Sequence, residues 1–450
     1  MTSITKVVRA RRAVLPEGEA AVSIAIAGET IAAIGAYDEP YDCTDVTVLA
    51  DDEVLLPGLI DAHVHVNEPG RTEWEGFASV TKAAAAGGIT TLVDMPLNSK
   101  PATTSVANLE LKREVAKDQL MMDVGFWGGA IPGNVDDLEP LWNEGVFGFK
   151  CFLGDSGLEE YPYLNQEELR AAMVEIATFG GLLIAHAEDA GTLDQAPHTN
   201  GRDFMAFMRS HPASAEDAAI ATVIEAVRET GCRTHILHLA SASALPLIKA
   251  AKAEGLPITV ETCPHYLTFD AEEVPDGATQ FKCCPPLRDH ANRMELWRGL
   301  ADGTIDFIAS DHSPSTADLK SLDTGDFGTA WGGISSVQLG LPAVWTQARQ
   351  LGHSLSDVVR WMGSNPADVV GIAGKGRLAI GARADLAIVA PDDEFIVDKE
   401  ALFHKNKVSP YDGRTLTGVV RATWLAGEPI DLEGRRRGRE LVRGRDLVQA

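Results

Sequence analysis

Residue types that bind metal ions stand at the ends of five predicted strands. These candidate ligands are His63, His65, Lys150, His186, His238 and Asp311. His63 and His65 are two residues apart, so on a strand both side chains point to the same face, with Cα atoms roughly 6.6 Å apart. One histidine alone is usually structural, whereas this set at successive strand ends predicts a metal site.

Lys150 is the unusual member of the set, because an ammonium group would be repelled by a nearby dication. It could instead pair with a charged substrate or form a Schiff base. A third possibility is carboxylation by CO2, which turns the amine into an anionic group able to bridge two ions. The charge balance favours carboxylation, since two dications among neutral imidazoles need more than the one carboxylate of Asp311.

Eight short apolar segments must position these residues. We predict strands at Leu55–Val66, Ile89–Met95, Asp123–Gly128, Val146–Phe152, Leu182–Ala187, Thr234–Leu239, Ile258–Cys263 and Ile305–Ser310. Amphipathic segments between them predict helices at Trp74–Ala86, Glu167–Phe179, Glu216–Glu229 and Ala242–Ala253. Regular alternation of strand and helix predicts an α/β fold, a (β/α)8 TIM-like barrel whose chemistry lies at the carboxyl ends of its strands. A doubly wound sheet is the alternative, but the glycine fingerprint expected after its first strand is absent.

Both ends of the chain read differently, as short strands with turns. Chain termini commonly lie close together, so we expect the two ends to build one small β-sandwich domain. The predicted division is residues 1–56 for its first part, 57–370 for the barrel, and 371–450 for its second part and a C-terminal tail.

The composition restricts the partners. The net charge of −26 makes binding to nucleic acid or to an anionic membrane surface improbable. No apolar run long enough to span a membrane occurs. The six cysteines form none of the spacings typical of zinc ribbons or disulfide frameworks. Scattered thiols of this kind predict a cytoplasmic protein.

The strand-end residues and the strings around them resemble the amidohydrolase superfamily, in its binuclear branch of cyclic amidases with dihydroorotases, hydantoinases and allantoinases. Among the strings are Asn67-Glu-Pro-Gly70, Asp94-Met-Pro-Leu-Asn98, Lys282-Cys-Cys-Pro-Pro-Leu-Arg288 and Trp331-Gly-Gly-Ile-Ser335. The resemblance implies a barrel with a β-sandwich, two divalent ions of the zinc type (with Co2+, Mn2+ or Fe2+ as alternatives) and N6-carboxylation of Lys150 by CO2. It also implies a homotetramer acting on a small cyclic ureide.

Within that branch the sequence resembles the allantoinases. Related dihydroorotases usually carry an arginine two residues after the second metal histidine, where it holds the substrate carboxylate. Asn67 stands there in this chain, which fits an uncharged ring such as allantoin. The resemblance implies ring opening to allantoate by a hydroxide that bridges two ions, with Asp311 moving the proton. Dihydroorotase and hydantoinase activities stay open as alternatives, as does a catalytically silent scaffold.

Four residues beside the metal motifs are candidates for contacting the substrate or its intermediate. Asn67, Asn98 and Ser313 lie beside the metal motifs and could bind ring or ureido carbonyls, and His265 could stabilise an oxyanion or cap its strand. The string Trp331-Gly332-Gly333 could form a pocket wall. Cys151 and Cys284 fall near the same strand ends, but no partner pattern in the sequence favours them as nucleophiles, so we expect both to pack.

Overall fold

The middle of the chain folds into parallel strands, as a computed structural model of residues 3–445 shows. Six strands form one sheet in the order β14-β13-β12-β11-β10-β9, and three form another in the order β6-β7-β8. The bounds are β6 (Leu59–Val64), β7 (Ile89–Asp94), β8 (Asp123–Phe126), β9 (Gly128–Gly129), β10 (Phe149–Phe152), β11 (Leu182–His186), β12 (Arg233–Ile236), β13 (Ile258–Thr262) and β14 (Phe307–Ile308). This arrangement confirms the predicted α/β class.

The two parallel sheets approach each other at both ends. Only Trp127 separates β8 from β9. At the other side, an isolated parallel bridge joins Val64 of β6 to His312, just beyond β14. The carboxylate of Asp61 accepts a hydrogen bond from the Ser310 amide at 3.1 Å, and the amide of His65 donates to the His312 carbonyl at 2.9 Å. The carboxyl ends of the first and last parallel strands are therefore fastened to each other.

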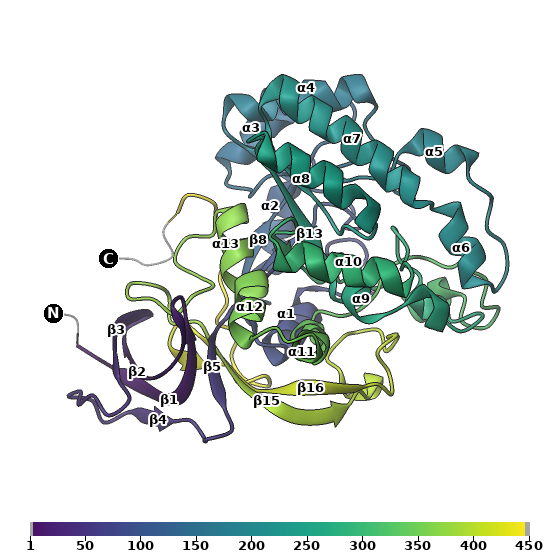
Figure 1. The fold of residues 1–450 in the computed structure, drawn as a ribbon. Helices are drawn as coiled ribbons and strands as arrows, with labels where there is room; N and C mark the ends of the chain where they lie inside the picture. The colour runs from purple at the N-terminus through teal and green to yellow at the C-terminus, as the bar shows by residue number, and fades with distance from the viewer. Residues whose placement is uncertain (1–2, 446–450) are drawn as a thin grey trace.

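Helices follow most of these strands (Figure 1). Their bounds are α1 (Phe77–Ala86), α2 (Val106–Ala116), α3 (Val135–Asn143), α4 (Gln166–Thr178), α5 (Ala190–Gln195), α6 (Phe204–Ser210), α7 (Ala213–Thr230), α8 (Leu245–Ala253), α9 (Pro264–Thr268), α10 (His290–Ala301), α11 (Gly340–Gln350), α12 (Leu355–Val359) and α13 (Asn365–Val370). In α4, Asn165 and Glu168 form a capping box, and Leu169, Met173 and Ile176 bury one face. The predicted helix over Trp74–Ala86 begins later, at Phe77.

Strands from both ends of the chain share a further sheet. Its order is β17-β16-β15-β5-β1-β2-β3, with β4 paired to β1. The bounds are β1 (Lys6–Leu15), β2 (Gly18–Ala27), β3 (Thr30–Ala36), β4 (Val46–Val48), β5 (Val54–Pro57), β15 (Leu386–Ile396), β16 (Thr415–Leu425) and β17 (Glu428–Pro429). In Figure 1 the purple and yellow strands lie together below the helix-rich part. The predicted terminal segments extend to residues 1–2 and 446–450, which lie outside the described residues.

The prediction of one continuous strand at Leu55–Val66 is wrong. Its first residues form β5, which pairs with β1 and β15 in the terminal sheet, and its later residues form β6. Gly58 separates the two strands, and a Cβ there would lie 2.2 Å from the hydroxyl oxygen of Thr90. An apolar run cannot reveal this break, because both strands are buried and hydrophobic.

Among residues 3–445, no helix is both long enough and apolar enough to cross a membrane.

Candidate metal centre

The six predicted metal ligands converge at the carboxyl ends of the parallel strands. His65, Lys150, His186, His238 and Asp311 line one cavity of about 720 Å³, and His63 lies fully buried beside it. The Asp311 Oδ1 atom lies 3.2 Å from Nε2 of His63 and 3.4 Å from Nε2 of His65. The rings of His186 and His238 have centroids 4.6 Å apart. Five separate strand ends thus deliver their side chains to one place.

The donor atoms of this cluster suit divalent metal ions. Ligand atoms of His63, His238 and Asp311 all lie within 4.8 Å of one another. Nε2 of His63 and Nδ1 of His238 are buried and form no hydrogen bond of acceptable geometry within residues 3–445, which is unusual for polar atoms unless an ion binds them. Burial lowers the pKa of both histidines and brings that of His65 to about 4. The rings are therefore neutral and able to coordinate.

The ionisation states of Lys150 and Asp311 also suit the binding of divalent metal ions. Burial lowers the pKa of Lys150 to about 8, although Asp311 opposes this shift, so a neutral amine is accessible near physiological pH. Carbamate formation requires that neutral amine. Burial disfavours the ionised form of Asp311, but His63, His65 and His238 outweigh it and hold its pKa well below its usual value. Asp311 is therefore an anionic ligand type.

Two buried glutamates that the sequence analysis did not single out hold the histidine rings. Glu261, on β13, contacts Nδ1 of His63, and its other oxygen lies 3.2 Å from Nε2 of His235. Glu188, just after β11, lies 2.9 Å from Nε2 of His186. A carboxylate behind an imidazole fixes its tautomer and orientation and raises its basicity as a ligand. Glu261 is a charged residue inside an apolar strand, and that pattern in the sequence could have indicated its role. Glu188 offers no comparable signal.

The backbone is strained where it presents the site. Asn67, Asn98, His238 and Asp311 all have positive φ angles, between 35° and 67°, although none is glycine. Such conformations are costly and gather at functional sites, where the surrounding structure enforces them.

The predicted substrate contacts divide into two groups. Asn98 and Ser313 line the cavity, with the Asn98 amide 3.2 Å from Nδ1 of His65 and the Ser313 hydroxyl donating to Asp311 Oδ1 at 2.6 Å. Asn67 and His265 are fully buried and are not among the described residues that line it. Asn67 instead donates to the Pro314 carbonyl at 3.3 Å, which directs its side-chain amide toward that loop.

His265 belongs to a second buried cluster with Cys263 and Asp311. Neither of its ring nitrogens has a hydrogen-bond partner among the described residues, and burial lowers its pKa to about 4. Burial also raises the pKa of the Cys263 thiol, so the thiol stays protonated and is a poor ligand. Cys263 and His265 are not among the described residues that line the cavity, and the protonated Cys263 thiol is a weaker donor than the imidazoles of the first cluster.

Trp331, Gly332 and Gly333 line the cavity, in line with the expectation that this string forms part of its wall. Cys151 is fully buried, whereas Cys284 lines the cavity. The Cys284 Sγ atom lies 4.0 Å from Nε2 of His211, a neighbour that the sequence could not reveal because 73 residues separate the two.

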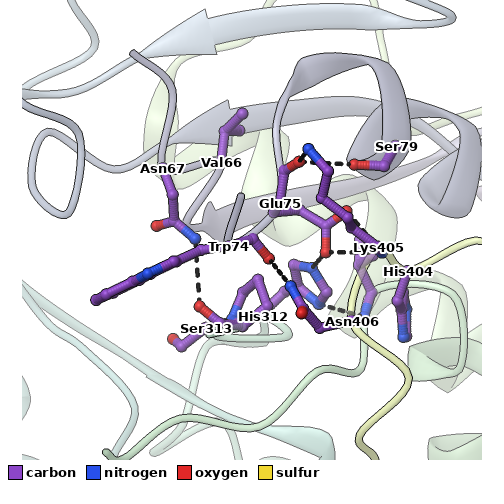
Figure 2. Close-up of polar contacts among 12 residues, drawn as sticks. Val66, Asn67, Trp74, Glu75, Ser79, His312, Ser313, His404, Lys405 and Asn406 are labelled. Atoms are coloured by element: carbon purple, nitrogen blue, oxygen red, sulfur yellow. Dashed lines mark hydrogen bonds and ion pairs between the residues drawn. The ribbon is translucent and has the colours of Figure 1, made fainter. Parts of the chain in front are cut away.

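A segment near the chain's end holds the loop that precedes α1 (Figure 2). The Glu75 carboxylate accepts from the Lys405 amide at 3.2 Å and lies 3.3 Å from Nε2 of His312. His312 Nδ1 accepts from the Ser336 amide, so its Nε2 carries the proton that faces Glu75. Asn406 donates to the Trp74 carbonyl at 2.7 Å. This network holds the residue directly after Asp311.

Comparisons with known proteins agree with this geometry. The amidohydrolase family profile matches residues 54–430, and the chain belongs to the amidohydrolase family. An allantoinase from Streptomyces avermitilis is 57% identical over 434 residues, covering 96% of this chain and 97% of that protein. An allantoinase from Saccharomyces cerevisiae is 47% identical over 382 residues, covering 84% and 82%.

Solved structures of the same superfamily share the fold. An L-hydantoinase (dihydropyrimidinase) from Arthrobacter aurescens aligns with a TM-score of 0.90 at 28% identity, covering 98% of this chain and 100% of that one. The resemblance predicted from the strand-end motifs, and with it the class of hydrolase acting on cyclic amides, is confirmed.

Proposed function

We propose that this enzyme opens the ring of allantoin by hydrolysis and yields allantoate. The observation that carries the reaction class is the convergence of four imidazoles, a buried lysine and an anionic aspartate around one cavity. Support for allantoin as the substrate comes from relatives that are named allantoinases in bacteria, yeast and plants. The similarity to a hydantoinase structure favours hydantoin hydrolysis as the second candidate.

The proposed cofactor is a pair of divalent ions, zinc being our first choice and cobalt, manganese or iron the alternatives. His63, His65, His186, His238, Asp311 and a carboxylated Lys150 would hold them. The unpartnered nitrogens of His63 and His238 support this assignment. When bound, such ions would polarise an amide carbonyl and lower the pKa of water, so that hydroxide is available as a nucleophile near neutral pH.

The residues of the chain supply proton transfer and orientation. Asp311 is anionic and takes the proton of the attacking water, then returns it to the ring nitrogen that leaves. The Ser313 hydroxyl holds Oδ1 of Asp311 at 2.6 Å, which fixes the carboxylate for both transfers. Asn98 lines the same cavity and is placed to bind a ring carbonyl, whereas Asn67 and His265 support the site from behind.

The architecture proposed around this site is a closed eight-stranded barrel over residues 57–370 with a small β-sandwich from 1–56 and 371–450. The bridge from Val64 to His312 and the near-continuity of β8 and β9 support closure. We further propose a homotetramer, which light scattering of the purified protein tests. The free state of all six cysteines is consistent with the proposed cytoplasmic location.

Metal removal and reloading test the proposed function. Enzyme stripped by a chelator should lose allantoin hydrolysis, measured as allantoate formed, and should regain it with zinc, cobalt or manganese. Activity that survives complete loss of metal would contradict the proposed centre.

A further inference from the structure

His211 borders the cavity without belonging to the candidate metal ligands. It follows α6 directly and precedes Pro212, where α7 is about to begin. Its Nδ1 atom lies 3.0 Å from Glu188 Oε1, and the other oxygen of Glu188 lies 2.9 Å from Nε2 of His186. One buried carboxylate therefore joins His186 to His211.

The position of His211 is fixed by a buried ion pair. The Arg288 guanidinium donates to the His211 carbonyl at 2.7 Å and to Glu216 Oε2 at 2.9 Å. Glu216 also accepts from the amides of Ala240 and Ser241, both at 3.0 Å. With its backbone and its Nδ1 atom both held, the imidazole has little freedom to turn.

The remaining ring nitrogen of His211 contacts Cys284, and both residues line the cavity. Nε2 lies 4.0 Å from the Cys284 thiol, which lines the same wall, and the His211 side chain is 24% exposed although Glu188 beneath it is only 2% exposed. Burial lowers the pKa of His211, but Cys284 and Glu188 raise it more strongly, and it reaches about 11. The ring is therefore protonated, with one N–H on Glu188 and the other toward the Cys284 sulfur at the cavity wall, a long contact that a substrate carbonyl can replace.

We propose that His211 is a specificity-determining residue that donates its Nε2 hydrogen to the carbonyl of the substrate's ureido arm. This inference rests on the proposed function. Allantoin is a hydantoin ring that carries a ureido group, and its ring must lie at the candidate metal ligands for hydrolysis. The Glu188 carboxylate lies between His186 and His211, so His211 is farther from the candidate metal ligands than His186 is. A donor at that distance is placed to meet the ureido substituent rather than the ring. A donor on a charged group binds a carbonyl more strongly than a neutral donor does.

Two substitutions separate the two nitrogens of the ring. His211→Gln keeps an amide donor where Nε2 stands, and His211→Asn keeps one only where Nδ1 faces Glu188. The steady-state KM and kcat for allantoin, the inhibition constant of hydantoin, and the bound metal are measured for both variants. The matched control is His290→Asn, which changes another histidine paired with a carboxylate, Asp270 at 2.9 Å, on the exposed face of α10.

His211→Asn should raise the KM for allantoin about ten-fold, the loss expected for a charged hydrogen bond, with kcat and metal content little changed. His211→Gln should recover part of that loss. The inhibition constant of hydantoin, which lacks the arm, should stay within about two-fold in both variants, and His290→Asn should match the wild type.

An unchanged KM in His211→Asn would overturn the assignment. So would an equal weakening of allantoin and hydantoin, or a loss of metal, because each would mean that His211 only supports Glu188 and His186. The proposed function fails separately: it fails if the wild-type enzyme does not open allantoin at all, whereas the role of His211 alone fails if the wild type opens it and the Asn variant keeps the wild-type KM.

Discussion

Each side chain of the candidate centre takes its charge state from its surroundings. Burial lowers the pKa of His63, His65 and His238, so these rings are neutral, whereas contacts with the same three rings hold the pKa of Asp311 well below its usual value. Burial lowers the pKa of Lys150 to about 8, so its neutral amine and its ammonium form are both accessible near physiological pH. A carboxylate that stays ionised among neutral rings is suited to accept a proton in catalysis.

Replacing that carboxylate tests its role. Asp311→Asn should lower kcat by about 10²–10⁴-fold, the range for a lost general acid and base, while much of the bound metal stays. Allantoin turnover and metal content measured on one preparation check this. Asp318→Asn, at an exposed aspartate on the same loop, is the control and should behave as wild type. A wild-type rate in Asp311→Asn would show that another group moves the proton.

The lowered pKa of Lys150 predicts how the centre assembles. Only the neutral amine reacts with CO2, and that form predominates as the pH rises above about 8. Metal-free enzyme given metal and bicarbonate should therefore regain activity faster at a pH one unit above this value than one unit below it. Lys150→Ala should show no response to bicarbonate. Recovery independent of both pH and bicarbonate would contradict carboxylation.

Sequence reasoning found the six candidate ligands because each follows a recognisable apolar strand. It did not reveal that Glu188 contacts His186 and His211, or that Glu75 contacts His312. Such contacts depend on how the chain folds and not on spacing alone. Asn67 and His265 stand close to the strand-end motifs in the sequence, but spacing along the chain does not tell whether a side chain faces the cavity.

At the scale of elements, the loop before α1 is held from the opposite end of the chain. Glu75 is fully buried, and its partners Lys405 and His312 both donate to it. Removing one partner of a buried polar contact leaves the others without hydrogen bonds.

Glu75→Ala should therefore cost about 1–3 kcal/mol of stability and lower the melting temperature by a few degrees. Glu73→Ala changes the exposed glutamate two residues earlier and should leave the melting temperature unchanged. Thermal unfolding monitored by circular dichroism compares them. Equal melting temperatures for the two variants would mean that the loop does not depend on this contact.

At the scale of the whole molecule, a buried ion cluster joins the parallel strands to the terminal sheet. The ammonium of Lys375 lies 2.8 Å from Asp123 at the start of β8 and pairs with Asp385 just before β15. Arg383 lies 3.4 Å from both carboxylates. Lys375 itself lies in a glycine-rich turn, and nothing in that local pattern predicts a buried charge.

Lys375→Met leaves two buried carboxylates short of a cation, which should cost about 3–5 kcal/mol. Lys249→Met, which breaks the exposed pair with Asp302, should cost about 0–1 kcal/mol. Urea unfolding of both variants measures the difference. Similar losses in the two would show that the cluster does not hold the parts of the molecule together.

The net charge of −26 can be compared with the charges at the candidate centre. The candidate centre gathers four imidazoles, Lys150 and the carboxylate of Asp311, whereas exposed carboxylates such as Asp51 and Glu433 lie on the surface. A small, largely uncharged ring enters such a centre more readily than a polyanion approaches the surface.

The most direct measurement of the central claim is a hydrolysis panel on metal-replete enzyme with allantoin, dihydroorotate, dihydrouracil and hydantoin. The account predicts the highest kcat/KM for allantoin, with allantoate as the product. A kcat/KM for allantoin below those of the other three would contradict the assigned substrate and leave only the membership of the amidohydrolase family.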